Sequence, residues 1–144
     1  IKVSILSKLN MGVLKLLEYF KSNNYFSNSD IEKLCNKYNK HKLSENLDNE
    51  YTAYSVNKGQ EIKLCLIDPK TKQPITDLNT TMFVLIHELA HIMTKQIGHP
   101  PEFWNNMKIL LQHASNLGIY TYINYRETPV WYCGEYVNDT PYIK

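Results

Sequence analysis

The sequence holds few of the features that mark disulfide-rich, membrane-spanning or strongly basic proteins. Among 144 residues there are three cysteines, no Cys-x-x-Cys pair and one arginine. No apolar run approaches the roughly 18 residues of a membrane-spanning helix, so we expect no membrane contact within this chain. The net charge of +2 is too small to imply nucleic-acid binding on its own. These absences leave an ordinary globular protein, whose core draws on 43% hydrophobic residues.

The three cysteines predict no disulfide framework. Cys35, Cys65 and Cys133 are widely spaced and odd in number, and Cys65 lies in an apolar strand pattern typical of a small core residue. We therefore expect a reducing, intracellular compartment. Lysine and asparagine, at 15 residues each, indicate an AT-rich coding genome, viral genomes included. The chain begins with Ile1, so a targeting or anchor segment upstream would not be visible.

The length predicts one domain over residues 1–144, and we expect a monomer. Its N-terminal part, 1–50, has helical apolar spacing. The central part, 51–118, combines strand and helix patterns and holds the candidate site. The tail, 119–144, is rich in tyrosine and strand-like.

Local patterns divide these parts further. Apolar spacing predicts a helix from about residue 8 to 21. Ser29 and Glu32 together have the pattern of a capping box that starts a second helix. Alternating residues in 51–57 and 61–67 predict two strands joined by a turn.

A long, almost wholly apolar helical pattern runs from Asp77 to Ile97. Gly98 is a typical helix stop, because glycine adopts left-handed backbone angles at low cost. The two prolines that follow suit the first turn of another helix, which ends near Asn116.

The motif His-Glu-Leu-Ala-His lies inside the long helix. His87 and His91 are four residues apart, so both rings project from one side and can bind one tetrahedral Zn2+. Glu88 lies beside them, where its carboxylate can act as general base on a zinc-activated water. A buried apolar helix rarely offers partners for such a set, so a zinc site explains the motif better than core packing does.

A catalytic zinc site needs a third protein ligand and an open fourth position. His99 follows Gly98, where the chain can reverse and bring this ring back to the metal. Glu102, in the first turn of the next helix, is the alternative ligand, and we favour His99. We expect His113 to be a packing or surface residue, and we assign no role to His41.

The segment from HELAH through HPPEFW resembles the zincin peptidases of the WLM and SprT-like families, which are associated with degrading proteins crosslinked to DNA. Their pattern has an aromatic residue four positions after the third histidine, as Phe103 follows His99. The segment NKGQEIKLCLI also resembles the strand that precedes the helix in WLM domains. Over about residues 52–120, the resemblance implies an α+β, zincin-like fold with a small antiparallel sheet packed on the active-site helix. It also implies that an edge strand receives the substrate as an added strand.

Candidates for stabilising an oxyanion lie in the tail. Metallopeptidases commonly use a tyrosine, histidine or arginine for this purpose. The tail offers Tyr120, Tyr122, Tyr125 and Tyr132. We select Tyr132 and Tyr120, although core or surface packing is the commoner role for any one of them.

Three further residues receive structural roles. We expect Trp104 and Trp131 to be core aromatics rather than substrate platforms. Arg126, the one arginine, is expected to form a surface ion pair.

These observations predict a zinc-dependent metalloendopeptidase that acts on polypeptides. Lys33, Lys37 and Lys40 form a stripe on the second helix; a solvated face is its ordinary explanation, and a phosphate-contacting edge is the alternative. With the family resemblance, this stripe adds the hypothesis of a protease that acts on DNA-associated or DNA-crosslinked proteins. The remaining alternative is a non-catalytic or latent zinc-stabilised binding module, whose tyrosine-rich tail fills the open position or the cleft.

Overall fold

The computed structural model of the chain describes residues 2–23, 28–38, 43–45, 53–56, 61–95 and 98–144. In these ranges the helices and strands, in chain order, are α1 (Lys2–Ser22), α2 (Ser29–Lys37), β1 (Leu43–Glu45), β2 (Ala53–Val56), β3 (Glu61–Leu64), α3 (Leu78–Met93), α4 (Pro101–Asn116), β4 (Val130–Tyr132) and β5 (Glu135–Val137). The protein therefore mixes helices with small sheets, which is compatible with the expected α+β class. None of the helices in the described ranges has the length and apolar character needed to cross a membrane.

The larger sheet has three strands in the order β1-β3-β2. Strand β2 pairs with β3 in antiparallel register, with Ala53 opposite Leu64. Strand β1 pairs with β3 in parallel, with Leu43 opposite Ile62. The expected antiparallel sheet is thus wrong in this detail, because a strand from the part expected to be helical joins it. A parallel partner this far away in sequence leaves no short-range turn signal.

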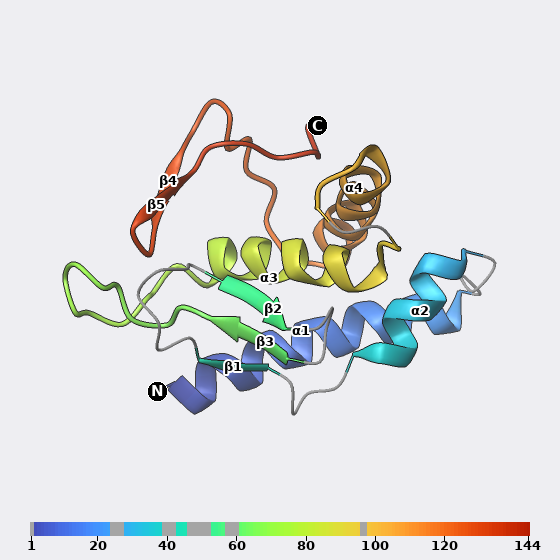
Figure 1. The fold of residues 1–144 in the computed structure, drawn as a ribbon, viewed down its shortest axis with the longest axis horizontal. Helices are drawn as coiled ribbons and strands as arrows, with labels where there is room; N and C mark the ends of the chain where they lie inside the picture. The colour runs from blue at the N-terminus through green and yellow to red at the C-terminus, as the bar shows by residue number, and fades with distance from the viewer. Residues whose placement is uncertain (1, 24–27, 39–42, 46–52, 57–60, 96–97) are drawn as a thin grey trace.

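Helix α3 crosses the middle of the molecule, with the sheet and α1 on one side and α4 and the C-terminal segment on the other (Figure 1). It contacts α1, α2, α4, β2, β3 and β4. Its almost continuous apolar pattern follows from these contacts, because a helix packed on most sides needs apolar residues on most sides. Its fully buried apolar residues include Leu85, Leu89, Ala90, Ile92 and Met93.

The start of α2 differs from the expected capping box. Asn28 is the N-cap residue, and its side-chain oxygen accepts the backbone N–H groups of Asp30 and Ile31 at 2.9 and 3.2 Å. Ser29 is already the first helical residue. The prediction of Ser29 and Glu32 as the cap was wrong, since asparagine competes equally well for this position one residue earlier.

Helix α3 begins as expected and ends early. The Asp77 side chain caps it by accepting the Thr80 N–H at 2.9 Å. The helix ends at Met93, with Thr94 as the C-cap in extended conformation, four residues before the expected end at Ile97. The chain therefore leaves the helix before Gly98.

The C-terminal tail contains a hairpin of β4 and β5. Its two turn residues, Cys133 and Gly134, have φ values of 51° and 92°. Positive φ at both central residues defines the type I′ turn that suits the twist of a two-residue hairpin.

A disulfide joins Cys65, just after β3, to Cys133 in the hairpin turn, with a Cα–Cα distance of 6.4 Å. The expectations of no disulfide and of Cys65 as a simple core thiol were wrong. The pairing also removes the support that the cysteine count lent to a reducing compartment. The two residues are 68 positions apart, and sequence alone gives no pairing over such a separation.

Removing this crosslink tests the fold. Because it closes a long loop of the unfolded chain, replacing both Cys65 and Cys133 by Ala should lower the free energy of unfolding by about 2–4 kcal/mol. Urea unfolding of oxidised protein measures this. The matched control is Cys35→Ala, since Cys35 carries a free thiol and its loss leaves the crosslink intact. Alkylation of all three cysteines in denatured, unreduced protein would contradict the disulfide.

Candidate metal centre

Helix α3 supplies the first two histidines of the centre. His87 and His91 lie one turn apart, with ring centroids separated by 4.9 Å. Both are half-buried. His99 follows the helix end and Gly98, whose φ of 87° lies in the left-handed region that favours glycine. The chain thereby returns an exposed histidine to the two on the helix.

The three imidazoles converge closely enough to share one ion. Their ligand atoms all lie within 4.8 Å of one another, and the Nε2 atoms of His91 and His99 are 3.2 Å apart. Nitrogen ligands at Zn–N distances of about 2.0–2.1 Å in a tetrahedron are about 3.3 Å from each other. The donor chemistry and spacing therefore fit zinc. Among the His, Cys, Asp and Glu side chains of the described ranges, no fourth member joins this group.

Phe103 packs against all three histidine rings. Its ring centroid lies 5.0 Å from that of His87, 4.4 Å from His91 and 4.8 Å from His99. The side chain is fully buried, so it fixes the rings from the protein side. This contact gives a physical reason for an aromatic residue four positions after the third histidine.

Trp104 borders the same group from the solvent side. Its ring stacks on His99, with 5.3 Å between centroids and 30° between planes. It is 39% exposed, and Trp131 is similarly exposed while its Nε1 donates to Asp68 at 3.1 Å. The expectation that both tryptophans are core residues was wrong, because both pack with one face on protein and leave the other to solvent.

The electrostatic environment favours neutral imidazole. Burial, together with the neighbouring charges of His91 and His99, lowers the pKa of His87 to about 3. A histidine must be neutral to offer a lone pair to a metal. The centre therefore keeps this ring in its ligating form across the physiological pH range.

The two carboxylates considered from the sequence have different surroundings. Glu88 is 6% exposed and directly follows His87 on α3. Glu102 is exposed, and a hydrogen bond with Asp30, together with desolvation and the Asp30 charge, raises its pKa. The histidine group therefore forms with His99, and Glu102 lies outside it.

The two selected tyrosines are buried away from solvent. The Tyr132 hydroxyl donates to the Cys65 carbonyl at 2.8 Å, and the Tyr120 hydroxyl accepts the Ile123 N–H at 3.3 Å. Both side chains are 2% exposed. Burial and desolvation raise the pKa of Tyr132 to about 12. These contacts occupy the hydroxyls in the core.

Other residues singled out from the sequence have simple environments. His113 packs on the rings of Tyr19 and Phe20, each at 5.4 Å between centroids, as expected of a packing residue. Arg126 pairs with Asp139 at the surface, also as expected.

The lysine stripe is described only in part. On α2, Lys33 is half-buried and Lys37 is exposed. Lys40 and His41 lie outside the described residues.

A polar network at the end of α3 escaped prediction. The Asn106 amide donates to the Thr94 hydroxyl at 3.1 Å and to the Asp30 carboxylate at 3.0 Å. The Thr94 hydroxyl in turn donates to the Ala90 carbonyl at 2.6 Å. Asn106 is 3% exposed, so α2, α3 and α4 are joined where the chain turns toward His99. The sequence holds one signal for this network: an asparagine lies on the same apolar helix face as Phe103, and a buried asparagine needs hydrogen-bond partners.

These features define a class of protein: mixed helices and small sheets, with a central helix that carries a three-histidine group able to hold a metal ion. Residues 32–131 match the WLM domain family. The match covers more than half of the chain, so the chain belongs to the WLM family, and the resemblance is confirmed. This family is associated with zincin-like proteases.

Viral proteins are among the relatives. "Uncharacterized protein R325" of Acanthamoeba polyphaga mimivirus is 39% identical over 110 residues, which cover 76% of this chain and 55% of that protein. "Uncharacterized protein 136R" of Invertebrate iridescent virus 6 is 41% identical over 69 residues, which cover 47% of this chain and 38% of that protein. The chain thus spans about half the length, or less, of these curated relatives. Their viral origin fits the composition. No solved structure matches the chain.

Asn106 provides a test of how the centre is held. Replacing it by Ala removes the donor from the buried Thr94 hydroxyl and from the half-buried Asp30 carboxylate, and this should lower the free energy of unfolding by about 1–3 kcal/mol. Zinc affinity should fall as well, because the end of α3 loses its tie to α4. Urea unfolding and zinc titration measure both effects. Asn105→Ala, at an exposed neighbouring position, is the matched control, and equal losses in the two variants would contradict this role.

Proposed function

We propose that this chain is a zinc-dependent metalloendopeptidase. The observation that carries the proposal is the convergence of His87, His91 and His99 within 4.8 Å beside a buried Glu88, in a member of the WLM family. Histidine triads with an open position suit catalytic zinc, whereas structural zinc sites commonly use four protein ligands.

The three histidines would hold the ion through their ring nitrogens. Bound zinc supplies Lewis acidity, which activates water and polarises a peptide carbonyl. Phe103 keeps the rings in position from below, and the neutral state of His87 keeps its lone pair available. The protein thus contributes a preorganised, partly desolvated donor set.

Glu88 is the proposed general base. Its carboxylate takes a proton from the attacking water and later delivers this proton to the amide nitrogen of the leaving group. Burial beside the histidines suits this role, because it holds the carboxylate at a fixed place next to the proposed metal site.

The edge strand β2 is the proposed docking site for the substrate backbone. It ends the sheet order β1-β3-β2, and it contacts α3, the helix that bears the motif. An extended peptide added to the outer edge of β2 would form main-chain hydrogen bonds with this strand and lie next to α3.

The alternative is a non-catalytic or latent zinc-stabilised module. In this alternative the tyrosine-rich tail fills the fourth coordination position or the cleft. Three of the tail tyrosines are engaged elsewhere: Tyr120, Tyr125 and Tyr132 are buried and hydrogen-bonded in the core. This observation supports the enzyme over the module.

The variant Glu88→Gln separates zinc binding from peptide hydrolysis. It should bind one zinc per chain like the wild type and lose at least about a hundredfold in cleavage rate of a denatured protein, since general-base catalysis contributes about 10²–10⁴-fold. Metal analysis and gel-based digestion of denatured casein measure these outcomes.

The matched control is Glu18→Gln, an exposed position on α1, which should cleave casein at the wild-type rate. Zinc-loaded wild type that leaves casein intact would favour the binding module. Undiminished cleavage by Glu88→Gln would remove Glu88 from the mechanism.

A second candidate is a DNA-stimulated form of this protease. Lys33 and Lys95 lie close enough to Glu102 to lower its pKa through their charges, and Glu102 follows His99 by three residues. Cations from α2 and from the end of α3 are thus near the histidine group. DNA that contacts this face would lie beside the proposed active site, where it could deliver bound proteins.

The double variant Lys33→Gln with Lys37→Gln tests this candidate. If both lysines contact phosphates, the slope of log affinity for single-stranded DNA against log salt should become shallower by about 1.4, at about 0.7 per contact. Fluorescence anisotropy over a salt series measures it. Lys70→Gln with Lys72→Gln, an exposed pair in the loop before α3, is the control. Wild-type cleavage that is indifferent to DNA at low salt would eliminate the DNA-stimulated form and leave the peptidase proposal intact.

A further inference from the structure

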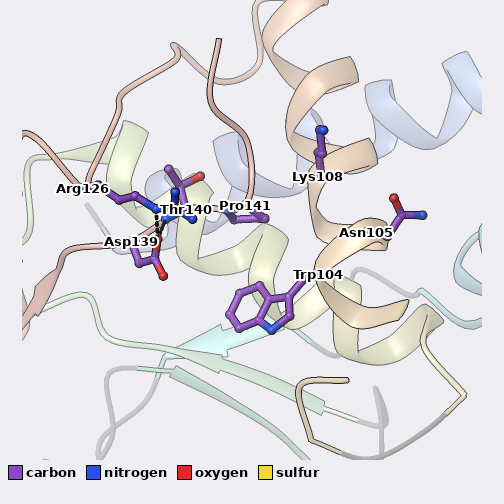
Figure 2. Close-up of a pocket in the computed structure, with 7 residues that line it drawn as sticks. All are labelled: Trp104, Asn105, Lys108, Arg126, Asp139, Thr140 and Pro141. Atoms are coloured by element: carbon purple, nitrogen blue, oxygen red, sulfur yellow. Dashed lines mark hydrogen bonds and ion pairs between the residues drawn. The ribbon is translucent and has the colours of Figure 1, made fainter. Parts of the chain in front are cut away.

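A surface pocket of about 480 Å³ has Trp104 in its wall. The same indole stacks on His99, so one side chain borders both the pocket and the histidine group. Figure 2 shows the indole reaching from α4 toward Asp139 and Pro141, which form the opposite wall with Arg126. The volume falls within the range of about 300–1,000 Å³ typical of ligand pockets. A peptide lying across the histidines would therefore have this pocket within reach.

The wall opposite α4 is anchored in the core. Thr140 is 2% exposed, and its hydroxyl accepts the Tyr142 N–H at 3.2 Å. Tyr142 is buried against the Tyr122 ring, with 5.5 Å between centroids. The pocket is consequently a built feature with two fixed sides.

The charges of the pocket are unequal. It contains two cations, Lys108 and Arg126, and one carboxylate, Asp139. That carboxylate is already engaged, because it accepts Nε–H of Arg126 and the Thr140 N–H. Lys108 forms no ion pair with any described residue. The lysine ammonium and the Nη groups of Arg126 remain as donors for a further anionic group.

We propose that this pocket binds a carboxylate of the peptide substrate close to the scissile bond. The carboxylate belongs to a Glu or Asp side chain or to the C-terminus of a short peptide. An extended chain advances about 3.3 Å per residue, so the residue that reaches past Trp104 lies within about three positions of the bond cleaved at the histidines. This inference rests on the proposed peptidase function and adds a substrate class to it.

Cleavage of matched peptides tests the proposal. The substrates are fluorescein-labelled octapeptides of one common sequence. In each peptide one position carries Glu, Gln or Lys, and that position is moved along the sequence from peptide to peptide. Every peptide is made with a free and with an amidated C-terminus. Wild type should prefer Glu over Gln about fivefold in kcat/KM at one position, or the free over the amidated terminus by the same factor. This is the size of effect that one solvent-accessible ion pair gives. The two arms distinguish a side-chain carboxylate from a terminal one.

Variants of Lys108 assign the preference to the pocket. Lys108→Met should bring the ratio close to one, mainly through KM, and Lys108→Glu should shift the preference toward the Lys peptide. Lys8→Met makes the same charge change at an exposed position on α1 and should keep the wild-type ratio. A preference that survives in Lys108→Met, or that disappears in Lys8→Met, would overturn the proposal.

A binding measurement separates this inference from the peptidase proposal. Anisotropy of the same peptides with zinc-loaded Glu88→Gln protein should show the same Lys108-dependent ratio without cleavage. If no peptide is cleaved by wild type but this ratio appears, hydrolysis fails and the pocket stands. If peptides are cleaved with no preference at any position or terminus, hydrolysis stands and the pocket assignment is refuted.

Discussion

Helix α3 has to satisfy two opposing requirements, burial on almost every side and access for the ring nitrogens of two of its residues. The sheet, the other helices and β4 contact it, so most of its surface is apolar and desolvated. His87 and His91 occupy the strip that is only half-buried. Phe103 completes that strip by packing under the rings. The position of α4, and with it the return of the chain through His99, depends on this arrangement.

The polar groups near the centre reinforce the same geometry. Asn106 ties the end of α3 to α2 through a buried hydrogen bond with Thr94 and a part-buried one with Asp30, and its buried amide is costly to leave unpaired. Farther out, Trp104 separates the histidines from a pocket in which cations outnumber carboxylates. The surroundings thus change from apolar packing around Phe103, through the histidine rings, to a charged rim. This arrangement suits a site that must desolvate the scissile bond of a substrate and orient the residues on either side of that bond.

Features that depend on residues close together in the sequence were easier to predict than features that depend on residues far apart in it. The helical spacing of His87 and His91 and the glycine before His99 are local, and the structure brings these three residues together. Apart from the cap of α2 and the end of α3, the features that were missed involve partners distant in sequence. Strand β1 joins β3 in parallel, and Cys65 bonds to a cysteine 68 residues away. The exposure of Trp104 was missed for the same reason, since it depends on where the C-terminal segment lies.

The sequence by itself placed His87 and His91 on one side of a helix, because residues four apart share a side, and it offered His99 or Glu102 as the third partner. The sequence also indicated the family, because its short motifs can be recognised without knowledge of the tertiary structure around them. Only the tertiary structure decided that His99 rather than Glu102 joins the group, that Asn106 locks the helix end, and that a cationic pocket adjoins the histidines. Those outcomes depend on how α2, α4 and the C-terminal segment pack against α3. Packing joins residues by distance in space, which spacing along the chain does not encode.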